Sequence, residues 1–190
     1  MKISLRFFSA LSLLFLISSC SYLQNFVPKS SFSELDTVDN VAKLDIKSFF
    51  NGDLEGFAIS QDQNGNITGT NTIKINASWE GNKGIIQEVF IYNGGKKDSR
   101  TWLVTFEDDG TFDAVGHNVA SPAKGRQIGN AAQMIYSLLI PANGVKEEVK
   151  FEDKMYLVDE KSMIKISSFR KNYSSSGKNI ISLKKVNVQK

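Results

Sequence analysis

The chain has 190 residues and a formal net charge of +3, with 41% hydrophobic and 23% charged residues, 14 glycines and three prolines. This composition is typical of a globular domain and excludes a disordered chain, a coiled coil or a disulfide-stapled scaffold. One histidine and one cysteine also exclude a zinc site built mainly from those two residue types.

The first twenty residues have the pattern of an export signal. Lys2 and Arg6 precede an apolar run, residues 7–17, which is much shorter than the roughly 20 residues of a membrane-spanning helix. Residues 16–20 read Leu-Ile-Ser-Ser-Cys, the bacterial lipobox pattern, in which the cysteine thiol takes a diacylglyceryl group and the peptidase cuts just before it. We therefore expect residues 1–19 to be a lipoprotein signal peptide and Cys20 to carry palmitate-type acyl chains. The alternative is an ordinary secretory signal in which Cys20 is incidental.

Removal of residues 1–19 changes the charge of the chain. It takes away Lys2 and Arg6 and no acidic residue, so the net charge falls from +3 to +1. The remaining basic residues are scattered, and we expect no nucleic-acid partner. Ser21 after the cysteine favours the outer membrane, facing the periplasm. Residues 20–42 then form a lipidated, polar tether that links the membrane to a single folded domain, residues 43–190, and two or three acyl chains make this anchoring stable.

The domain has the pattern of a small β protein. Residues 44–50 predict a short helix that ends at Asn51-Gly52. Residues 118–132 predict one long irregular loop, either a functional lid or a surface crossover. Nine strand-like runs are separated by turns rich in Asn, Asp and Gly: 54–60, 68–79, 85–92, 100–107, 111–116, 133–140, 146–158, 163–169 and 179–188. They predict a mainly β fold, a single antiparallel curled sheet or β-barrel, lipocalin-like by analogy, with a short N-terminal helix.

Three charged residues lie on strand faces whose other members are apolar: Glu88, Arg100 and Asp153. A buried charge is costly unless it is paired, so each should find a partner. The favoured interpretation is a structural ion pair or hydrogen-bonded brace. The alternative is a pocket in which these three side chains contact the headgroup of a ligand.

No catalytic or metal-binding constellation is visible in the sequence. His117 has no adjacent nucleophile or orienting acid. Ser162 and Lys165 match the S-x-x-K pattern, but in a strand-like run without companion motifs. A calcium-loop-like segment begins at Asp62, yet its sixth and twelfth positions are isoleucines where Gly and Glu are needed, so a hairpin turn explains it better. We expect no metal, no cofactor and no enzymatic activity.

Several short motifs occur in a fixed order: Phe49-Phe50-Asn51-Gly52 with Leu54 and Gly56, Trp79-Glu80-Gly81, Glu88-x-Phe90-x-Tyr92, Arg100-x-Trp102, Gly125, Gly129-Asn130 and Asp153-Lys154-Met155-Tyr156-Leu157. In this order, and together with the lipobox, they resemble the domain-of-unknown-function family 3833, uncharacterised lipoproteins of Proteobacteria. The resemblance covers residues 43–186 and implies no established activity. One departure is Lys154, which stands where relatives carry Trp, on the outward face of its strand.

Together these patterns predict a membrane-anchored envelope lipoprotein that binds a lipid or other apolar small molecule inside its barrel. Met134, Tyr136 and Leu138 share one face of residues 133–140 and are candidates to line such a cup. The alternative is a structural or partner-binding lipoprotein whose barrel is filled by its own side chains. A lipid-modifying enzyme is a third possibility, which requires Glu88 and Asp153 to converge in a pocket. The oligomeric state is open.

Overall fold

The computed structural model describes residues 35–38, 41–142, 144–171 and 175–186, which belong to one compact unit. The predicted signal peptide, Cys20 and the first part of the tether lie outside these residues and stay predictions. Among the described residues, no helix is both long and apolar enough to cross a membrane.

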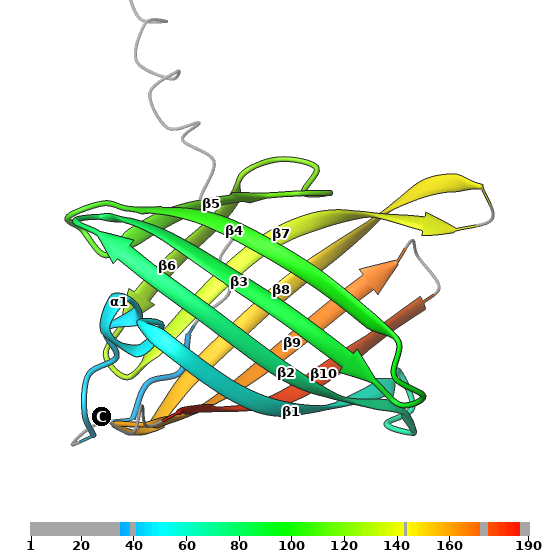
Figure 1. Cartoon of the computed structure of the whole chain (residues 1–190), viewed down its shortest axis with the longest axis horizontal. Helices are drawn as coiled ribbons and strands as arrows, with labels where there is room; N and C mark the ends of the chain where they lie inside the picture. The colour runs from blue at the N-terminus through cyan, green and yellow to red at the C-terminus, as the bar shows by residue number, and fades with distance from the viewer. Residues whose placement is uncertain (1–34, 39–40, 143, 172–174, 187–190) are drawn as a thin grey trace, which may run out of the picture. The chain divides into compact units, whose positions relative to one another are not determined.

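One short helix and ten strands make up the fold (Figure 1). The helix is α1 (Ile46–Phe49). The strands are β1 (Gly52–Asp62), β2 (Ile67–Glu80), β3 (Lys83–Tyr92), β4 (Lys97–Phe106), β5 (Thr111–Gly116), β6 (Ala123–Ile128), β7 (Ala131–Ala142), β8 (Val145–Asp159), β9 (Ser162–Lys171) and β10 (Ser175–Lys185).

The sheet is a closed antiparallel barrel. Each strand pairs with its neighbour along the chain, and β1 pairs with β10 from Leu54–Lys185 to Asp62–Gly177. In the described chain, closure pairs every strand on both sides, except where residues 97–101 of β4 and 136–142 of β7 extend past the short β5 and β6. The barrel form of the predicted fold is therefore confirmed, with the short helix at its N-terminal side.

Tight turns set the up-and-down order, and the β1–β2 turn shows how. The Asp62 carboxylate accepts hydrogen bonds from the backbone N–H groups of Asn64 and Asn66, both at 2.9 Å, while Gly65 takes a positive φ of 84°. The side-chain hydrogen bond from Asn66, together with these backbone bonds, lowers the pKa of Asp62. The hairpin interpretation of this segment is confirmed.

The prediction of a long loop over residues 118–132 is wrong, because it contains β6. The strand was missed because its inward positions, Ala123, Gly125 and Gln127, carry no run of large apolar side chains. Gly125 lies directly under the Phe112 ring, which fills the space that a side chain would take. The rest of the loop is bonded to β7, with the Ala120 N–H donating to the Ser137 carbonyl at 2.9 Å.

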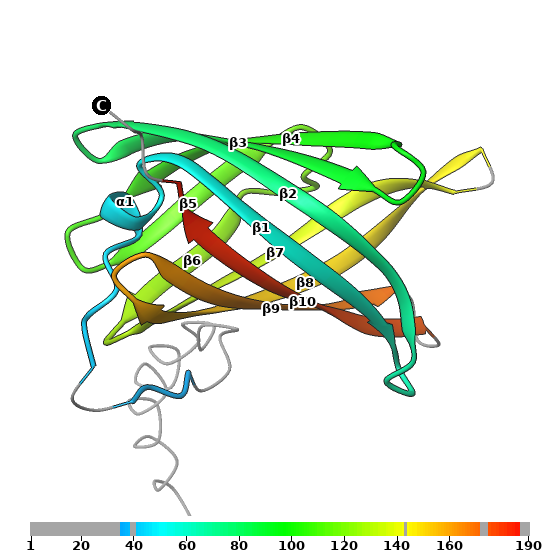
Figure 2. The ribbon, with the colours of Figure 1, turned by 60° about the horizontal axis from the view of Figure 1, so that its bottom comes forward.

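The helix closes one end of the barrel; in Figures 1 and 2 it lies at the left, opposite the β7–β8 hairpin. Asp45 caps it by accepting the Lys47 N–H at 3.0 Å, and Ile46 and Phe49 are buried. The Trp79 indole donates to the Phe50 carbonyl at 2.8 Å and ties the helix to β2. Aromatic rings fill the space behind it, in the pairs Trp79–Phe106 and Phe106–Phe112.

Residues 35–38 lie against the outside of this closed end. Leu35 is buried, and the Val38 N–H donates to Asn130 Oδ1 at 3.0 Å. The Leu44 N–H then bonds the Gly129 carbonyl at 2.9 Å. The last described part of the predicted tether is thus bound to the β6–β7 turn.

We predict that Gly56→Ala destabilises the barrel at its closing seam. A Cβ at position 56 would overlap the Ser182 carbonyl oxygen of β10 and come within 2.8 Å of Leu183 Cδ2. Overpacking of this kind costs about 1–3 kcal/mol, measured as the free energy of unfolding in urea. Gly69→Ala is the matched control, since nothing lies within 4 Å of its added Cβ. A loss of the same size at Gly69 would contradict this explanation.

Candidate ligand site in the barrel interior

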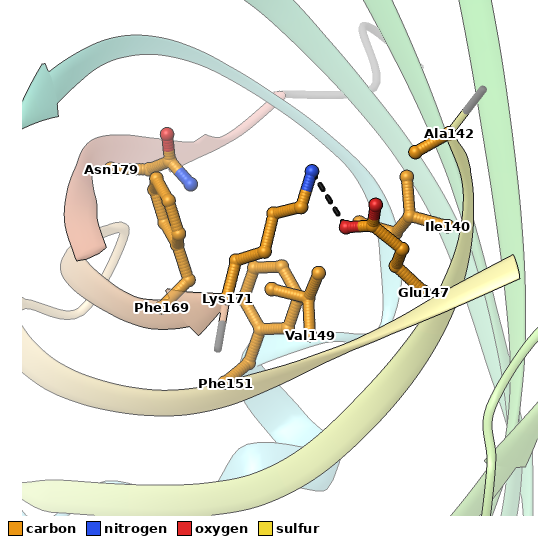
Figure 3. Close-up of a pocket in the computed structure, with 8 residues that line it drawn as sticks. All are labelled: Ile140, Ala142, Glu147, Val149, Phe151, Phe169, Lys171 and Asn179. Atoms are coloured by element: carbon orange, nitrogen blue, oxygen red, sulfur yellow. Dashed lines mark ion pairs between the residues drawn. The ribbon is translucent and has the colours of Figure 1, made fainter. Parts of the chain in front are cut away.

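A cavity of about 240 Å³ opens at the end of the barrel opposite α1. We call it the mouth cavity; β7 to β10 supply its lining, shown in Figure 3: Ile140, Ala142, Glu147, Val149, Phe151, Phe169, Lys171 and Asn179. Inward positions alternate along these strands, which places the lining side chains in register across the sheet. The lining is mostly aliphatic and aromatic.

A single ion pair provides most of the polarity of the mouth cavity. Lys171 Nζ lies 2.7 Å from Glu147 Oε2, and Figure 3 shows the two side chains pointing toward each other. Both are partly exposed, with 40% of the Lys171 side chain and 25% of the Glu147 side chain open to solvent. The Lys171 side chain is therefore at the rim, above the apolar walls, whereas the Glu147 Oε2 atom that its ammonium faces is buried.

Aromatic rings form the floor of the mouth cavity. Phe151 stacks on Tyr136 with ring centroids 5.1 Å apart and nearly parallel planes, and Phe169 lies 5.9 Å from Phe151. Tyr136 is buried on β7, one inward position closer to the centre of the barrel than Leu138. This layer separates the mouth cavity from the charged residues below it.

Beneath the floor lies a charged cluster, in which Glu88 and Asp153 are buried and Arg100 and Lys165 are partly buried. Lys165 Nζ is 3.7 Å from Glu88 Oε1 and 3.5 Å from Asp153 Oδ2, so it bridges the two carboxylates. Arg100 Nε lies 3.9 Å from Glu88 Oε2. The cluster thus contains two anions and two cations, from β3, β4, β8 and β9.

Two aromatic side chains complete the polar contacts of this charged cluster. The Trp102 indole N–H donates to Glu88 Oε2 at 3.1 Å. The Tyr136 hydroxyl accepts from Arg100 Nη1 at 3.5 Å and donates toward Asp153, at 3.4 Å from each carboxylate oxygen. The guanidinium carbon of Arg100 also lies 5.4 Å from the centre of the Phe90 ring, within cation–π range.

Burial and a neighbouring carboxylate shift the pKa of Arg100 in opposite directions. The same two influences shift the pKa of Tyr136 in one direction. Burial disfavours the charged guanidinium, but the combined attraction of Glu88, Tyr136 and Asp153 outweighs it and raises the pKa of Arg100. Burial, reinforced by the negative charge of Asp153, strongly raises the pKa of Tyr136. Tyr136 therefore keeps its proton and can donate a hydrogen bond to Asp153.

On the other side of the charged cluster, toward α1, there is an inner chamber of only about 50 Å³. Glu88, Arg100, Asp153 and Lys165 line one side of it, and apolar residues such as Phe112 and Met155 line the other. This space holds a few water molecules at about 10–15 Å³ of such volume each. The closed half of the barrel is therefore nearly filled by its own side chains.

The three charged residues singled out in the sequence are brought together. Glu88, Arg100 and Asp153 all face inward and meet in one cluster, as a brace requires. They lie below the floor of the mouth cavity and do not line it. Glu88 and Asp153 do converge, but on the ammonium of Lys165.

Sequence reasoning missed Lys165, and the pattern of its strand explains why. In β9 the outward positions Ile164 and Ile166 are more apolar than the inward Lys165 and Ser167, so alternation suggests the opposite orientation. Lys171 is, in sequence, only one of the scattered basic residues. Its position in register with an inward Val149 on β8 is the signal that could have placed it in the barrel.

Nothing among the described residues forms a metal centre, since no three His, Cys, Asp or Glu side chains are grouped suitably. His117 is exposed in the β5–β6 connection. In the described part of the chain it makes no hydrogen bond or ion pair.

Fold and cavity define a class: a closed, up-and-down antiparallel β-barrel protein with an apolar cavity at one end. Within this class, the chain belongs to the family described as "Protein of unknown function (DUF3833)", which matches residues 26–185. The resemblance of the sequence to this family is confirmed, and the match begins earlier than residue 43. No curated protein sequence matches the chain.

Two solved structures are similar to this barrel. The S-type phycobiliprotein lyase CPES from Guillardia theta is 7% identical, with 77% of this chain and 95% of that chain covered and a TM-score of 0.57. A redesigned β-barrel is 13% identical, with 74% of this chain and 95% of that chain covered and a TM-score of 0.40. At such low identity the likeness to the lyase shows the fold alone.

We predict that Asp153→Asn lowers the free energy of unfolding by about 3 kcal/mol. The change leaves Lys165 with only Glu88, and breaking a buried ion pair typically costs about 3–5 kcal/mol. Asp113→Asn is the control, because its pair with Lys124 is exposed on the outside of the barrel and is worth less than about 1 kcal/mol. Equal, small effects of both substitutions in urea unfolding would show that the charged cluster is not a brace.

Proposed function

We propose that this protein is a non-catalytic, membrane-anchored envelope lipoprotein that binds an apolar small molecule or a lipid in the mouth cavity. The mouth cavity itself carries the proposal. Its walls are Ile140, Val149, Phe151 and Phe169, and it opens to solvent at the barrel end. Concave sites lined mainly by apolar side chains with a few polar groups are typical of small-molecule binding.

The size of the mouth cavity limits what it holds. At about 240 Å³ it exceeds the roughly 150 Å³ of an engineered cavity that binds benzene, but it is smaller than the about 300–1,000 Å³ of sites that enclose drug-sized ligands. It therefore suits a small apolar molecule, or one end of a longer molecule whose remainder projects beyond the rim. Native mass spectrometry of protein purified without detergent tests for such a ligand, and its consistent absence counts against binding.

The anchoring part of the proposal rests on the lipobox at residues 16–20 and on Cys20. Acyl chains on Cys20 hold the barrel at a membrane surface, at about 0.8 kcal/mol for each buried methylene. Ser21 supports the periplasmic face of the outer membrane as the location.

A second candidate function, partner binding, is favoured by an apolar row on the outside of the barrel. Ile85, Leu103 and Val115 are directly opposite one another on β3, β4 and β5, and each is between 43% and 52% exposed. Crosslinking in cells that joins this row to one envelope protein in a fixed stoichiometry would support this function in place of ligand binding.

We predict that Ala142→Trp blocks ligand binding. The indole would project from the edge of β7 into the mouth cavity and occupy much of its volume, with little change to the closed half. We expect at least a tenfold weaker affinity for an apolar fluorescent probe, measured by titration, while the free energy of unfolding changes by less than about 1 kcal/mol. Leu103→Trp, which adds the same indole on the outer surface, should leave probe affinity within twofold. Equal affinity of the Ala142→Trp protein would place binding elsewhere.

We predict that Cys20→Ser abolishes acylation. Cells fed an alkyne-tagged fatty acid should label the natural chain and not the variant, because the serine hydroxyl does not replace the thiol in lipidation. The natural chain should also sediment with membranes. Undiminished labelling of the Cys20→Ser protein would exclude this residue as the anchor.

A further inference from the structure

We infer that the ligand of the mouth cavity is a single-chain amphiphile with an anionic headgroup, bound with its apolar end inward and its headgroup at the rim. This inference rests on the proposed function and names its ligand class. It depends on three features: the depth of the mouth cavity, the position of Lys171, and the distribution of charge between the two barrel ends.

The depth of the mouth cavity fixes the orientation of a long ligand. Phe151, Phe169 and Tyr136 close its floor, and the charged cluster lies directly beneath. Glu88, Arg100, Asp153 and Lys165 contain equal numbers of negative and positive groups, so an additional charged headgroup pushed to this depth would be unpaired and costly. Only the apolar end of an amphiphile matches the walls and floor.

Lys171 is the charged donor best placed to meet the headgroup. Its ammonium is at the rim of the mouth cavity and 40% of its side chain is exposed. An ammonium has three N–H donors, and at most one of them is directed at Glu147, 2.7 Å away. The other two can donate to a carboxylate or phosphate whose chain lies in the cavity below.

Charge around the mouth also favours an anion. Exposed basic side chains are grouped on the turns and strand ends at this end of the barrel: Lys96, Lys97, Lys146, Lys150, Arg170 and Lys178. Fewer acidic residues accompany them, and the carboxylate of Asp62 is already bonded within its own turn. The turns and strand ends at the closed end carry both signs, with the acidic residues Glu80, Glu107, Asp108, Asp109, Asp159 and Glu160 and the basic residues Lys83, Lys161, Lys184 and Lys185. An anion is therefore attracted more strongly to the mouth end than to the closed end.

Photo-crosslinking tests the ligand class directly on the full chain. The probes share one ten-carbon chain with a diazirine at its far end and differ in the headgroup: carboxylate, phosphate, alcohol or trimethylammonium. Peptide mass spectrometry then locates each crosslink. We expect both anionic probes to label the strand segments that contain Phe151 and Phe169, at least fivefold more than the trimethylammonium probe. The ratio of carboxylate to phosphate labelling distinguishes a free fatty acid from a phospholipid-derived ligand, and either ratio supports the inference.

Two rim variants separate recognition from a structural role. Lys171→Met should reduce carboxylate labelling about tenfold, equivalent to about 1.4 kcal/mol, and leave alcohol labelling within twofold. Glu147→Gln should increase carboxylate labelling, since it frees the ammonium and removes a negative charge from the rim. A merely structural pair would lose labelling in both variants. Lys74→Met removes the same charge from an exposed site on β2 and should change nothing.

The outcomes distinguish the inference from the proposed function. Equal or stronger labelling of the mouth cavity by the trimethylammonium probe would overturn the anionic ligand class and leave apolar binding intact. Labelling confined to the rim by the far-end diazirine would overturn the inward orientation of the chain. Failure of all four probes to label the segments around Phe151 and Phe169 would contradict the proposed function itself.

Discussion

The structure depends on a layer of charge inside an otherwise apolar barrel. Glu88 and Arg100 meet within the β3–β4 hairpin and Asp153 and Lys165 within the β8–β9 hairpin, and the two pairs are joined only when these hairpins stand across the barrel from each other. A buried charge without its partner is strongly destabilising, so all four must be in place together. The loose distances, 3.5 to 3.9 Å, and the hydrogen bonds from Trp102 and Tyr136 are consistent with a balanced brace.

This layer divides the interior into two unlike halves. On the α1 side, Trp79, Phe106 and Phe112 and the helix itself fill the space and leave about 50 Å³. On the other side, no element closes the barrel in the described chain, and about 240 Å³ stays open above Phe151. The charged cluster explains why a ligand is restricted to the mouth: a deeper apolar ligand would have to displace paired charges. The proposed ligand binding thus belongs to the mouth cavity, and the structural bracing belongs to the charged cluster directly beneath it.

Alternation and turn chemistry were sufficient to predict the barrel, its short helix and the inward direction of Glu88, Arg100 and Asp153. These signals failed in strands whose inward face is not the more apolar one. β6 has small and polar inward residues because the Phe112 ring covers Gly125, and β9 faces its more polar side inward because Lys165 is paired there. The mouth cavity was not predictable, since its volume depends on which side chains meet across four strands. Arg100 is directly opposite Glu88 in the β3–β4 hairpin, so the turn between them already predicts that pair, whereas the contact of Lys165 with Glu88 needed the barrel closure, which no local pattern encodes.

An apolar, accessible cavity lies above the charged layer. A crystal structure under xenon pressure tests it most directly, because xenon enters dry apolar cavities. We predict a xenon atom between Phe151, Phe169 and Val149, and none beside Lys165 in the inner chamber. A mouth filled by its own side chains, or xenon bound only in the inner chamber, would contradict the account.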